Sequence, residues 1–168
     1  MGIFGKLFAG TEAVEPEGIY APMAGKTVPL SQVPDPTFSE GMLGEGIAIE
    51  PSSGTVCAPC SGTVENMFET GHAVCLKAEN GAEILIHVGL ETVGLAGKCF
   101  KIYVKNGQKV KKGQKLMDAD LEGIRRAGLE TITPVVVCNA DAVGALEKYT
   151  GSTVTGQDIV IRVKEKTL

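Results

Sequence analysis

His72 and His87 are the only histidines in the sequence of 168 residues, and each lies next to a short apolar run. A neutral imidazole nitrogen is a good nucleophile that can accept a phosphoryl group, provided that the other ring nitrogen donates to a fixed acceptor. A second imidazole beside it can donate to the phosphoryl oxygens and stabilise charge during transfer. If the fold brings the two rings together, the pair therefore indicates phosphoryl transfer through a phosphohistidine.

A single predicted hairpin contains both histidines. Residues 72–89, HAVCLKAENGAEILIHVG, have an Asn-Gly dipeptide at their centre, which is the strongest two-residue turn signal. With these two residues as the loop, Val74 pairs with His87, and His72 lies opposite Gly89. Because side chains alternate between the two faces of a sheet, the imidazoles then become diagonal neighbours on one face.

The cysteines do not form a recognisable zinc or redox site with the histidines. CAPC resembles a C-x-x-C motif, but it belongs to an internal repeat in which IYAPMAG and VCAPCSG align. Cys57 and Cys60 then occupy apolar positions of the repeat, and the histidines lie 15 positions apart, too far for a structural zinc finger. We expect all five cysteines to be small, buried free thiols in a reducing cytoplasm: Cys57, Cys60, Cys75, Cys99 and Cys138.

Two other catalytic chemistries lack essential residues. A catalytic zinc site needs three protein ligands and an open position, so the two histidines would need a carboxylate or a residue of a partner. A serine triad is not supported, because the sequence contains no G-x-S-x-G motif.

Composition indicates one domain rich in turns. The 22 glycines favour an all-β fold, and the formal net charge of −4 argues against a nucleic-acid partner while fitting a basic protein partner. No apolar run approaches the roughly 20 residues that cross a bilayer, and no secretory signal is visible, so a cytoplasmic monomer is expected. Residues 1–17 are predicted to be a flexible N-terminal arm before a domain of residues 18–168, with at most peripheral membrane contact through residues 1–10.

The predicted fold is an antiparallel β sandwich or barrel with internal strand-turn-strand repeats and two or three short helical segments. Each copy of the repeat should begin one strand-turn-strand unit, and VKNGQKVKKGQKLMDAD should form two further short strands separated by glycine turns. PVVVC and DIVIRV are predicted as late core strands. Short helices are expected in DLEGIRRAG, with Asp120 as N-cap, and in DAVGALEKY, with Asp141 as N-cap.

Four separated motifs resemble the glucose-family enzyme IIA of the bacterial sugar phosphotransferase system. They are VPDPTFSEGMLGEGIAI, ETGHA, HVGLETVGLAGKCF and TPVVVCN, in this order, and the resemblance covers about residues 17–165. It implies that His87 accepts a phosphoryl group on Nε2 from the histidine phosphocarrier protein and passes it to a cysteine on the IIB domain of a sugar permease.

The resemblance also implies roles for neighbouring residues. His72 would donate to the phosphoryl group and be needed for onward transfer, while the hydroxyl of Thr70 would hold its ring. The carbonyl of Gly89 would accept from Nδ1–H of His87. Asp35 and Glu91 would surround the site with negative charge, although the family usually has Asp at the position of Glu91. An apolar docking patch for the partners would be formed by Phe38, Leu43, Phe68 and Val93.

No cofactor is required by this resemblance, although zinc bound between His72 and His87 is possible in a regulatory or adventitious role. Three alternatives remain. A biotinyl or lipoyl carrier is the first alternative, because the segment that ends in Lys115-Leu116-Met117 resembles the strand-turn-strand half of a biotinyl domain. However, the attachment lysine between two methionines is missing. A zinc peptidase of the lysostaphin type would need an H-x-H pair. A purely regulatory binding protein would have lost phosphoryl transfer.

Overall fold

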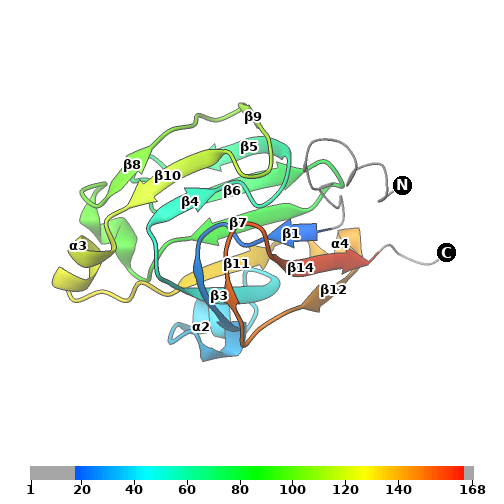
Figure 1. The fold of residues 1–168 in the computed structure, drawn as a ribbon, viewed down its shortest axis with the longest axis horizontal. Coiled ribbons are helices and arrows are strands. Elements are labelled where there is room, and N and C mark those ends of the chain that lie inside the picture. Colours follow the sequence, from blue (N-terminus) through cyan, green and yellow to red (C-terminus); the bar gives the residue numbers. More distant parts are fainter. Residues whose placement is uncertain (1–17, 165–168) are drawn as a thin grey trace.

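The computed structural model describes residues 18–164, so the predicted N-terminal arm and its membrane contact lie outside the described residues. Short strands dominate this range, as predicted, and Figure 1 shows their arrangement. They are β1 (Gly18–Tyr20), β2 (Gly25–Pro29), β3 (Glu45–Pro51), β4 (Thr55–Cys57), β5 (Gly62–Met67), β6 (Ala73–Ala78), β7 (Glu83–His87), β8 (Phe100–Ile102), β9 (Lys109–Val110), β10 (Lys115–Ala119), β11 (Thr133–Val137), β12 (Ala145–Lys148), β13 (Thr153–Val154) and β14 (Ile159–Lys164).

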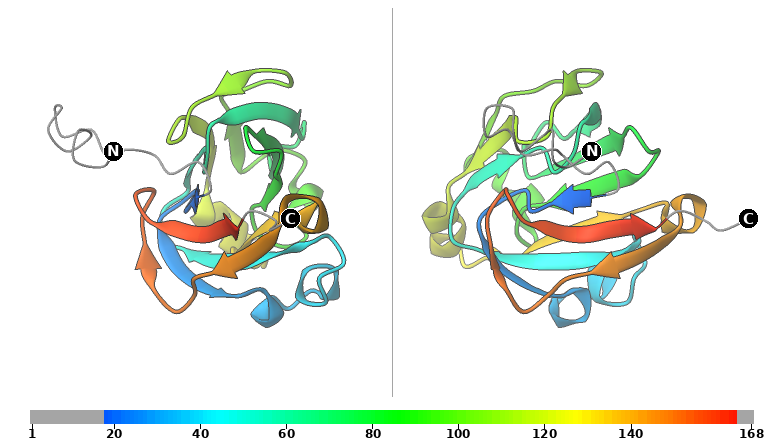
Figure 2. Two further views of the ribbon diagram at one scale, coloured as in Figure 1. Left: turned by 90° about the vertical axis from the view of Figure 1, so that its right-hand side faces the viewer. Right: turned by 45° about the vertical axis from the view of Figure 1, so that its right-hand side comes forward.

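The strands form one large and two small sheets. The eight-stranded sheet has the order β13-β2-β3-β11-β7-β6-β5-β9, and the three-stranded sheets have the orders β1-β14-β12 and β4-β10-β8. All strand pairings among the described residues are antiparallel. The large sheet is strongly curved, as the two views in Figure 2 show. The predicted antiparallel sandwich or barrel is therefore confirmed.

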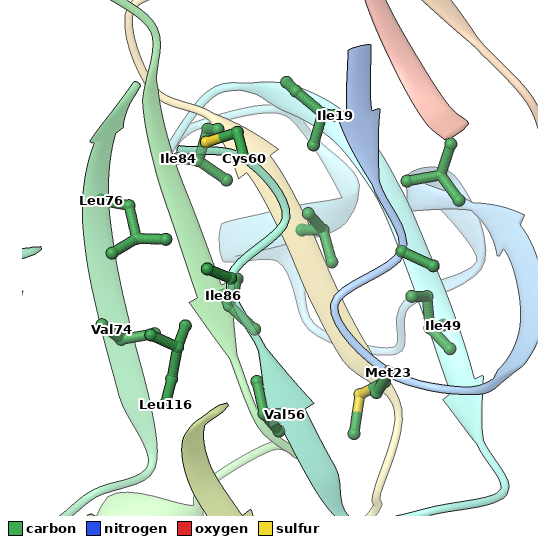
Figure 3. Close-up of a cluster of buried hydrophobic side chains, with 14 of the residues drawn as sticks. Ile19, Met23, Ile49, Val56, Cys60, Val74, Leu76, Ile84, Ile86 and Leu116 are labelled. Carbon is green, nitrogen blue, oxygen red and sulfur yellow. The ribbon is translucent and has the colours of Figure 1, made fainter. Parts of the chain in front are cut away.

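The main core lies between the sheets and takes side chains from all three. Val74 and Leu76 of β6, Ile84 and Ile86 of β7 and Leu116 of β10 belong to one cluster of buried side chains, which Figure 3 shows. The residues between them in β6 and β7 are less buried, because side chains alternate between the two faces of a strand. This alternation places His87, at the end of β7, on the face of the large sheet that points away from the core.

The internal repeat has the predicted structure. Its first copy contains the turn between β1 and β2, and its second copy contains the turn between β4 and β5. Cys60 is buried in the core (Figure 3), as predicted, but Cys57 is only half-buried where it pairs with Lys115. The expectation that all five cysteines are buried is also wrong for Cys138, which is exposed, while Cys75 and Cys99 are half-buried.

Residues 18–164 contain three short α-helices, α2 (Pro36–Ser39), α3 (Leu121–Arg126) and α4 (Ala140–Val143), together with the 3-10 helices η1 (Leu30–Gln32) and η2 (Thr92–Leu95). The prediction for α3 is confirmed, since Asp120 caps it by accepting from Gly123 N. A short helix also occurs at the second predicted position, but its predicted N-cap and extent are wrong. Asn139, and not Asp141, is the N-cap of α4, and the residues that follow the helix form β12, which pairs with β14. No helix within residues 18–164 is long and apolar enough to cross a membrane.

Candidate active site

The hairpin of β6 and β7 positions the first histidine, but its register differs from the predicted one. Ala73, and not Val74, pairs with His87. The loop has three residues, because Ala78 bonds to Ala82 and Gly81 adopts a left-handed backbone with φ of 91°. A left-handed residue after a tight turn adds one residue to the loop. The predicted two-residue loop is therefore wrong, and every partner in the hairpin shifts by one position.

Polar side chains stabilise this longer loop. Asn80 accepts from Ala82 N at 3.0 Å through its side chain. The Asn139 side chain, from the distant segment after β11, donates to Gly81 O at 2.9 Å and accepts from Glu83 N at 2.8 Å. A residue 58 positions away along the chain thus helps to fix the register, and the hairpin sequence alone carries no sign of it.

The two histidine rings nevertheless meet. Their centroids are 5.0 Å apart, and their planes are inclined at 80°. Regular alternation in the observed register would put the side chains of His72 and His87 on opposite faces. However, His72 precedes β6, and the chain turns at Gly71, whose φ is 73°, so its side chain does not follow the strand alternation. The predicted convergence is confirmed, whereas the geometry that was expected to produce it is wrong.

The His87 ring is held by a backbone carbonyl. Its Nδ1–H donates to Gly89 O at 2.8 Å, which leaves Nε2 of the neutral ring with a free lone pair. Gly89 has φ of 76°, and a Cβ atom there would lie 2.6 Å from Thr92 Cγ2 and 2.7 Å from Glu130 O. Any other residue would therefore displace the carbonyl that orients the His87 ring.

Thr92 is a supporting residue that the sequence did not reveal. It is fully buried, and its hydroxyl donates to Val88 O at 2.6 Å while its methyl group lies against Gly89. Leu90 N also donates to Glu130 O at 3.1 Å. These contacts fix the loop after β7, and through it the acceptor of the His87 ring. A threonine between Glu91 and Val93 has no distinctive pattern in the sequence.

The His72 ring is nearly buried and is held from two sides. The Thr70 hydroxyl lies 2.5 Å from its Nδ1, and the Phe68 ring stands edge-on to it with centroids 5.3 Å apart. Only 4% of His72 is exposed, whereas His87 is half-buried. The His87 ring is thus more accessible to a partner than the His72 ring, which lies buried beside it.

Both imidazoles have lowered pKa values. Burial, and to a lesser extent the neighbouring His87, lowers the pKa of His72 from 6.5 to about 4. Burial also lowers the pKa of His87, although the Gly89 carbonyl, Asp35 and Glu91 partly oppose the shift. At neutral pH both rings are therefore uncharged, which is the state that a nucleophilic nitrogen requires.

A pH titration followed by NMR of the imidazole resonances should show this directly. His72 should remain neutral until the pH approaches about 4, and His87 should titrate below the ordinary pKa of 6.5. The His72→Gln variant provides the assignment, since its only remaining titration is that of His87. A midpoint near 6.5 for either ring would contradict the burial that the structure gives it.

The same shift has a consequence for stability. Between pH 6.5 and about 4 the unfolded chain binds a proton at His72 that the folded chain does not bind. The free energy of unfolding therefore falls as the pH is lowered through this window, by up to roughly 1.4 kcal/mol per unit for this residue. The His72→Gln variant should lose less stability over this range than the unmodified chain.

The negative charges of Asp35 and Glu91 both act on His87, because each partly opposes the lowering of its pKa. This agrees with the expectation that the two carboxylates surround the site with negative charge. Asp35 is half-buried and caps α2, where its side chain accepts from Thr37 N at 3.0 Å. Glu91 is exposed and precedes η2 with a left-handed φ of 61°. Asp adopts this backbone region more readily than Glu, so the longer side chain occupies a strained position.

The predicted docking residues fall into two groups. Leu43, Phe68 and Val93 are exposed, at 39%, 36% and 54%. Phe38 is not: only 4% of it is exposed, because it packs in a second small core and its ring lies against His87 with centroids 5.1 Å apart. Phe38 therefore contributes little exposed area to a docking patch, and its ring packs beside His87 instead. Met42, which is 71% exposed, is an apolar surface residue that was not predicted.

Leu43 lies in the turn before β3, and Val93 lies in η2, two residues after Glu91. The structure brings together the imidazoles, their two hydrogen-bond partners and two phenylalanines.

The histidine pair alone is an incomplete metal site. The described part of the chain contains no group of three or more histidine, cysteine or carboxylate side chains placed to hold a metal ion. The chemistry of two imidazoles fits zinc, but further ligands would have to come from outside this range. The biotinyl alternative also gains no support, because Lys115 begins β10 and pairs with Asp118 instead of standing at a hairpin tip.

Comparison with known proteins gives a consistent set of similarities. The sequence model described as phosphoenolpyruvate-dependent sugar phosphotransferase system, EIIA 1, matches residues 17–143. The glucose-specific EIIA component of Bacillus anthracis is 44% identical over 165 residues, which are 98% of this chain and 100% of that protein. The mannose-specific EIIBCA component of Corynebacterium glutamicum is 46% identical over 161 residues, 96% of this chain but 23% of that longer protein.

A solved structure is similar as well. The glucose permease IIA of Mycoplasma capricolum superimposes with a TM-score of 0.79 at 34% sequence identity, covering 86% of this chain and 93% of that one. Sequence and structure thus give the same relationship over most of the described residues.

Proposed function

Since this chain belongs to the EIIA 1 family of the phosphoenolpyruvate-dependent sugar phosphotransferase system, we propose that it carries a phosphoryl group on Nε2 of His87. One observation supports this assignment above all. The bond from Nδ1–H of His87 to Gly89 O selects the tautomer whose Nε2 is free, and the His72 ring lies 5.0 Å away. His87 is therefore the nucleophile, and His72 is the neighbouring hydrogen-bond donor to the phosphoryl group.

In the first step the Nε2 lone pair attacks the phosphorus of a phosphohistidine on the histidine phosphocarrier protein. The new N–P bond forms as the N–P bond of the donor breaks, and the donor imidazole leaves with the electron pair. Because His87 is neutral at pH 7, no proton has to leave its Nε2 before attack. Nδ1–H stays bound to Gly89 O throughout, so the ring does not have to reorient.

His72 stabilises the transferred group. When the Thr70 hydroxyl donates to Nδ1 of His72, the proton of the neutral ring resides on Nε2, which can donate to a phosphoryl oxygen. The low pKa of His72 keeps this arrangement unchanged over the physiological pH range. Thr70 thus acts as a positioning residue that determines which nitrogen of His72 carries the proton.

In the second step a cysteine thiolate of a IIB domain attacks the phosphorus, and the bond to Nε2 of His87 breaks. His87 returns to its neutral form and is ready for another cycle. A IIB partner is supported by the similarity of this chain to about a quarter of an EIIBCA component, in which the corresponding region is covalently joined to the other parts. The proposed route is thus from phosphocarrier protein to His87 to IIB.

The surface around the histidines suits partners with a basic, partly apolar face. Asp35 and Glu91 provide negative charge, while Leu43, Phe68 and Val93 provide exposed apolar area. Apolar contacts at the centre of an interface contribute to affinity, and complementary charge accelerates encounter. The same surface would serve both donor and acceptor, since both must reach the same nitrogen.

Phosphotransfer with purified components tests the proposal. The chain is incubated with phosphoenolpyruvate, the general phosphotransfer proteins and a candidate IIB domain, and intact mass and phosphorus NMR are recorded. We expect one phosphoryl group per chain, labile in acid, with the chemical shift of a histidine phosphorylated at Nε2. A group on Nδ1, on a hydroxyl or on a cysteine of this chain would overturn the assignment.

A further inference from the structure

The charge of the chain is strongly segregated along the sequence. Residues 92–117 contain seven lysines and no acidic residue, which leaves nine basic and twenty acidic residues elsewhere. None of the seven is an arginine. We call them the lysine surface: Lys98, Lys101, Lys105, Lys109, Lys111, Lys112 and Lys115. A chain with a formal net charge of −4 therefore has one distinctly cationic segment of sequence.

A short tandem repeat builds most of this surface. VKNGQK (104–109) is followed directly by VKKGQK (110–115). In each unit the valine is buried, and the glycine adopts a positive φ of 85° or 89°. In each unit the glutamine side chain closes the turn by accepting from the amide of the first lysine, at 3.2 Å and 3.1 Å. The fold thus presents equivalent lysines on two successive turns.

The lysines are available to a partner. Six of them are exposed, and Lys112 is half-buried with Nζ 4.2 Å from the centre of the Tyr20 ring. Within residues 18–164 only Lys115 of the seven forms an ion pair, with Asp118 at 3.3 Å. Glu79 lines the same shallow hollow as Lys109 and Lys111 and offsets a further part of the charge. Asp118 and Glu79 carry two negative charges against the seven positive charges of the lysines.

Apolar and aromatic side chains stand among the lysines. Tyr103 is 42% exposed, and the Nζ atoms of Lys101 and Lys115 lie 5.4 Å and 4.8 Å from the centre of its ring. Ile102 is 38% exposed. A surface that combines amine groups with a tyrosine and an isoleucine matches the boundary between lipid headgroups and acyl chains, where tyrosine is enriched.

The lysine surface adjoins the candidate active site without overlapping it. Figures 1 and 2 show β8, β9 and β10 together at one end of the molecule, and α2 at the opposite end. Ile102 packs against Gly71, the residue before His72, so the two regions meet there. A partner bound to the turns at Gly107 and Gly113 would leave the rim that contains Asp35 free.

We propose that the lysine surface binds the anionic headgroups of a lipid bilayer. Lysine is a strongly hydrated point charge that attracts a charged surface without specific pairing, and polybasic segments bind anionic membranes in this way. Protein interfaces are instead depleted in lysine and enriched in arginine. Seven lysines and no arginine beside exposed Tyr103 therefore favour a lipid surface over an acidic protein.

Such binding would orient the chain at the membrane. The lysine surface faces the headgroups, and the rim of Asp35 and Glu91 is held away from lipids that repel it. The histidines then remain open to protein partners beside the bilayer. The lipid binding itself does not depend on the role of His87, so the two proposals can fail separately.

Vesicle co-sedimentation of the full chain tests the proposal. The probes are vesicles of phosphatidylcholine with and without phosphatidylglycerol, at low salt and at about 1 M salt, where the Debye length is about 3 Å. We expect binding only to vesicles that contain phosphatidylglycerol, and only at low salt. Equal binding to neutral vesicles, or no binding to the anionic ones, would overturn the proposal.

Two matched double variants locate the contact. Lys105→Gln/Lys111→Gln removes the equivalent lysines of the tandem repeat, and Lys26→Gln/Lys148→Gln removes the same charge from β2 and β12. At roughly five-fold per lysine, the first pair should weaken binding to anionic vesicles about 25-fold and the second less than about two-fold. Both should accept a phosphoryl group like the unmodified chain, which confirms that they are folded.

The remaining outcomes contradict the proposal. Unchanged binding by the first pair would mean that another segment, such as residues 1–17, contacts the lipid. Equal losses in both pairs would mean that only net charge matters. If the chain does not bind the vesicles but binds an acidic protein or a nucleic acid through the same lysines, the partner of this surface is not a lipid bilayer.

Discussion

The His87→Gln variant should take up no measurable phosphoryl group from the phosphocarrier protein. Glutamine fills a similar volume and offers an amide that can donate to Gly89 O, but it has no nucleophilic nitrogen. Loss of a covalent nucleophile costs on the order of 10⁶-fold in other enzymes. Phosphoryl uptake is measured by rapid mixing with the phosphorylated donor, followed by intact mass. We expect the signal to fall below detection.

Two controls make the result specific. Thermal unfolding should show that His87→Gln is folded, because the side chain is half-buried and lies outside the main core. Its affinity for the phosphocarrier protein should be unchanged within a few-fold, since the rim carboxylates and exposed apolar residues remain. Phosphoryl label that persists on the variant would mean that another residue of the chain is the acceptor.

The sequence predicted the chemistry of the site better than its geometry. The apolar residues in β6 and β7 alternate because one face of the sheet must be buried. This alternation can be recognised in the amino-acid sequence. Only two histidines exist, so a convergent site had one possible pair. The type of fold and the nature of the reacting side chain therefore followed from local patterns.

The features that the sequence did not predict correctly depend on contacts between segments that are distant along the chain. The loop of the hairpin gains a residue because Gly81 is left-handed and Asn139 bonds to the backbone beside it. Residues 145–148 have a helical pattern, yet they form β12 because β14 offers a pairing edge. The burial of Phe38 was not visible in the sequence, because it depends on the second small core that contains Leu90 and on the His87 ring. Tertiary packing decided each case over local propensity.

Two compensating errors explain why the site was still found. The wrong hairpin register would have put the rings on one face by regular alternation. In the observed register, the turn at Gly71 releases His72 from that alternation and lets its ring approach His87. Gly71 and Gly89 are visible in the sequence, but their left-handed backbone follows only from the structure.

The His72→Gln variant should separate the two half-reactions. It should still accept a phosphoryl group, since His87 keeps its nucleophilic Nε2 and its bond to Gly89 O. It should pass the group to a IIB domain roughly 10²-fold more slowly or worse, the scale of losing one oriented donor to developing charge. Single-turnover mixing of the phosphorylated variant with IIB measures the second step directly.

Thr70→Val provides the matching control, because it preserves size but removes the hydroxyl that orients Nδ1 of His72. If the proton on Nε2 of His72 is what matters, Thr70→Val should slow the second step in the same direction while leaving uptake nearly intact, and Thr70→Ser should restore it. Nitrogen NMR of His72 should show a changed tautomer balance in the valine variant alone. Normal transfer to IIB by His72→Gln would mean that the second imidazole is only a packing residue, and the burial that lowers its pKa would then have no part in the chemistry.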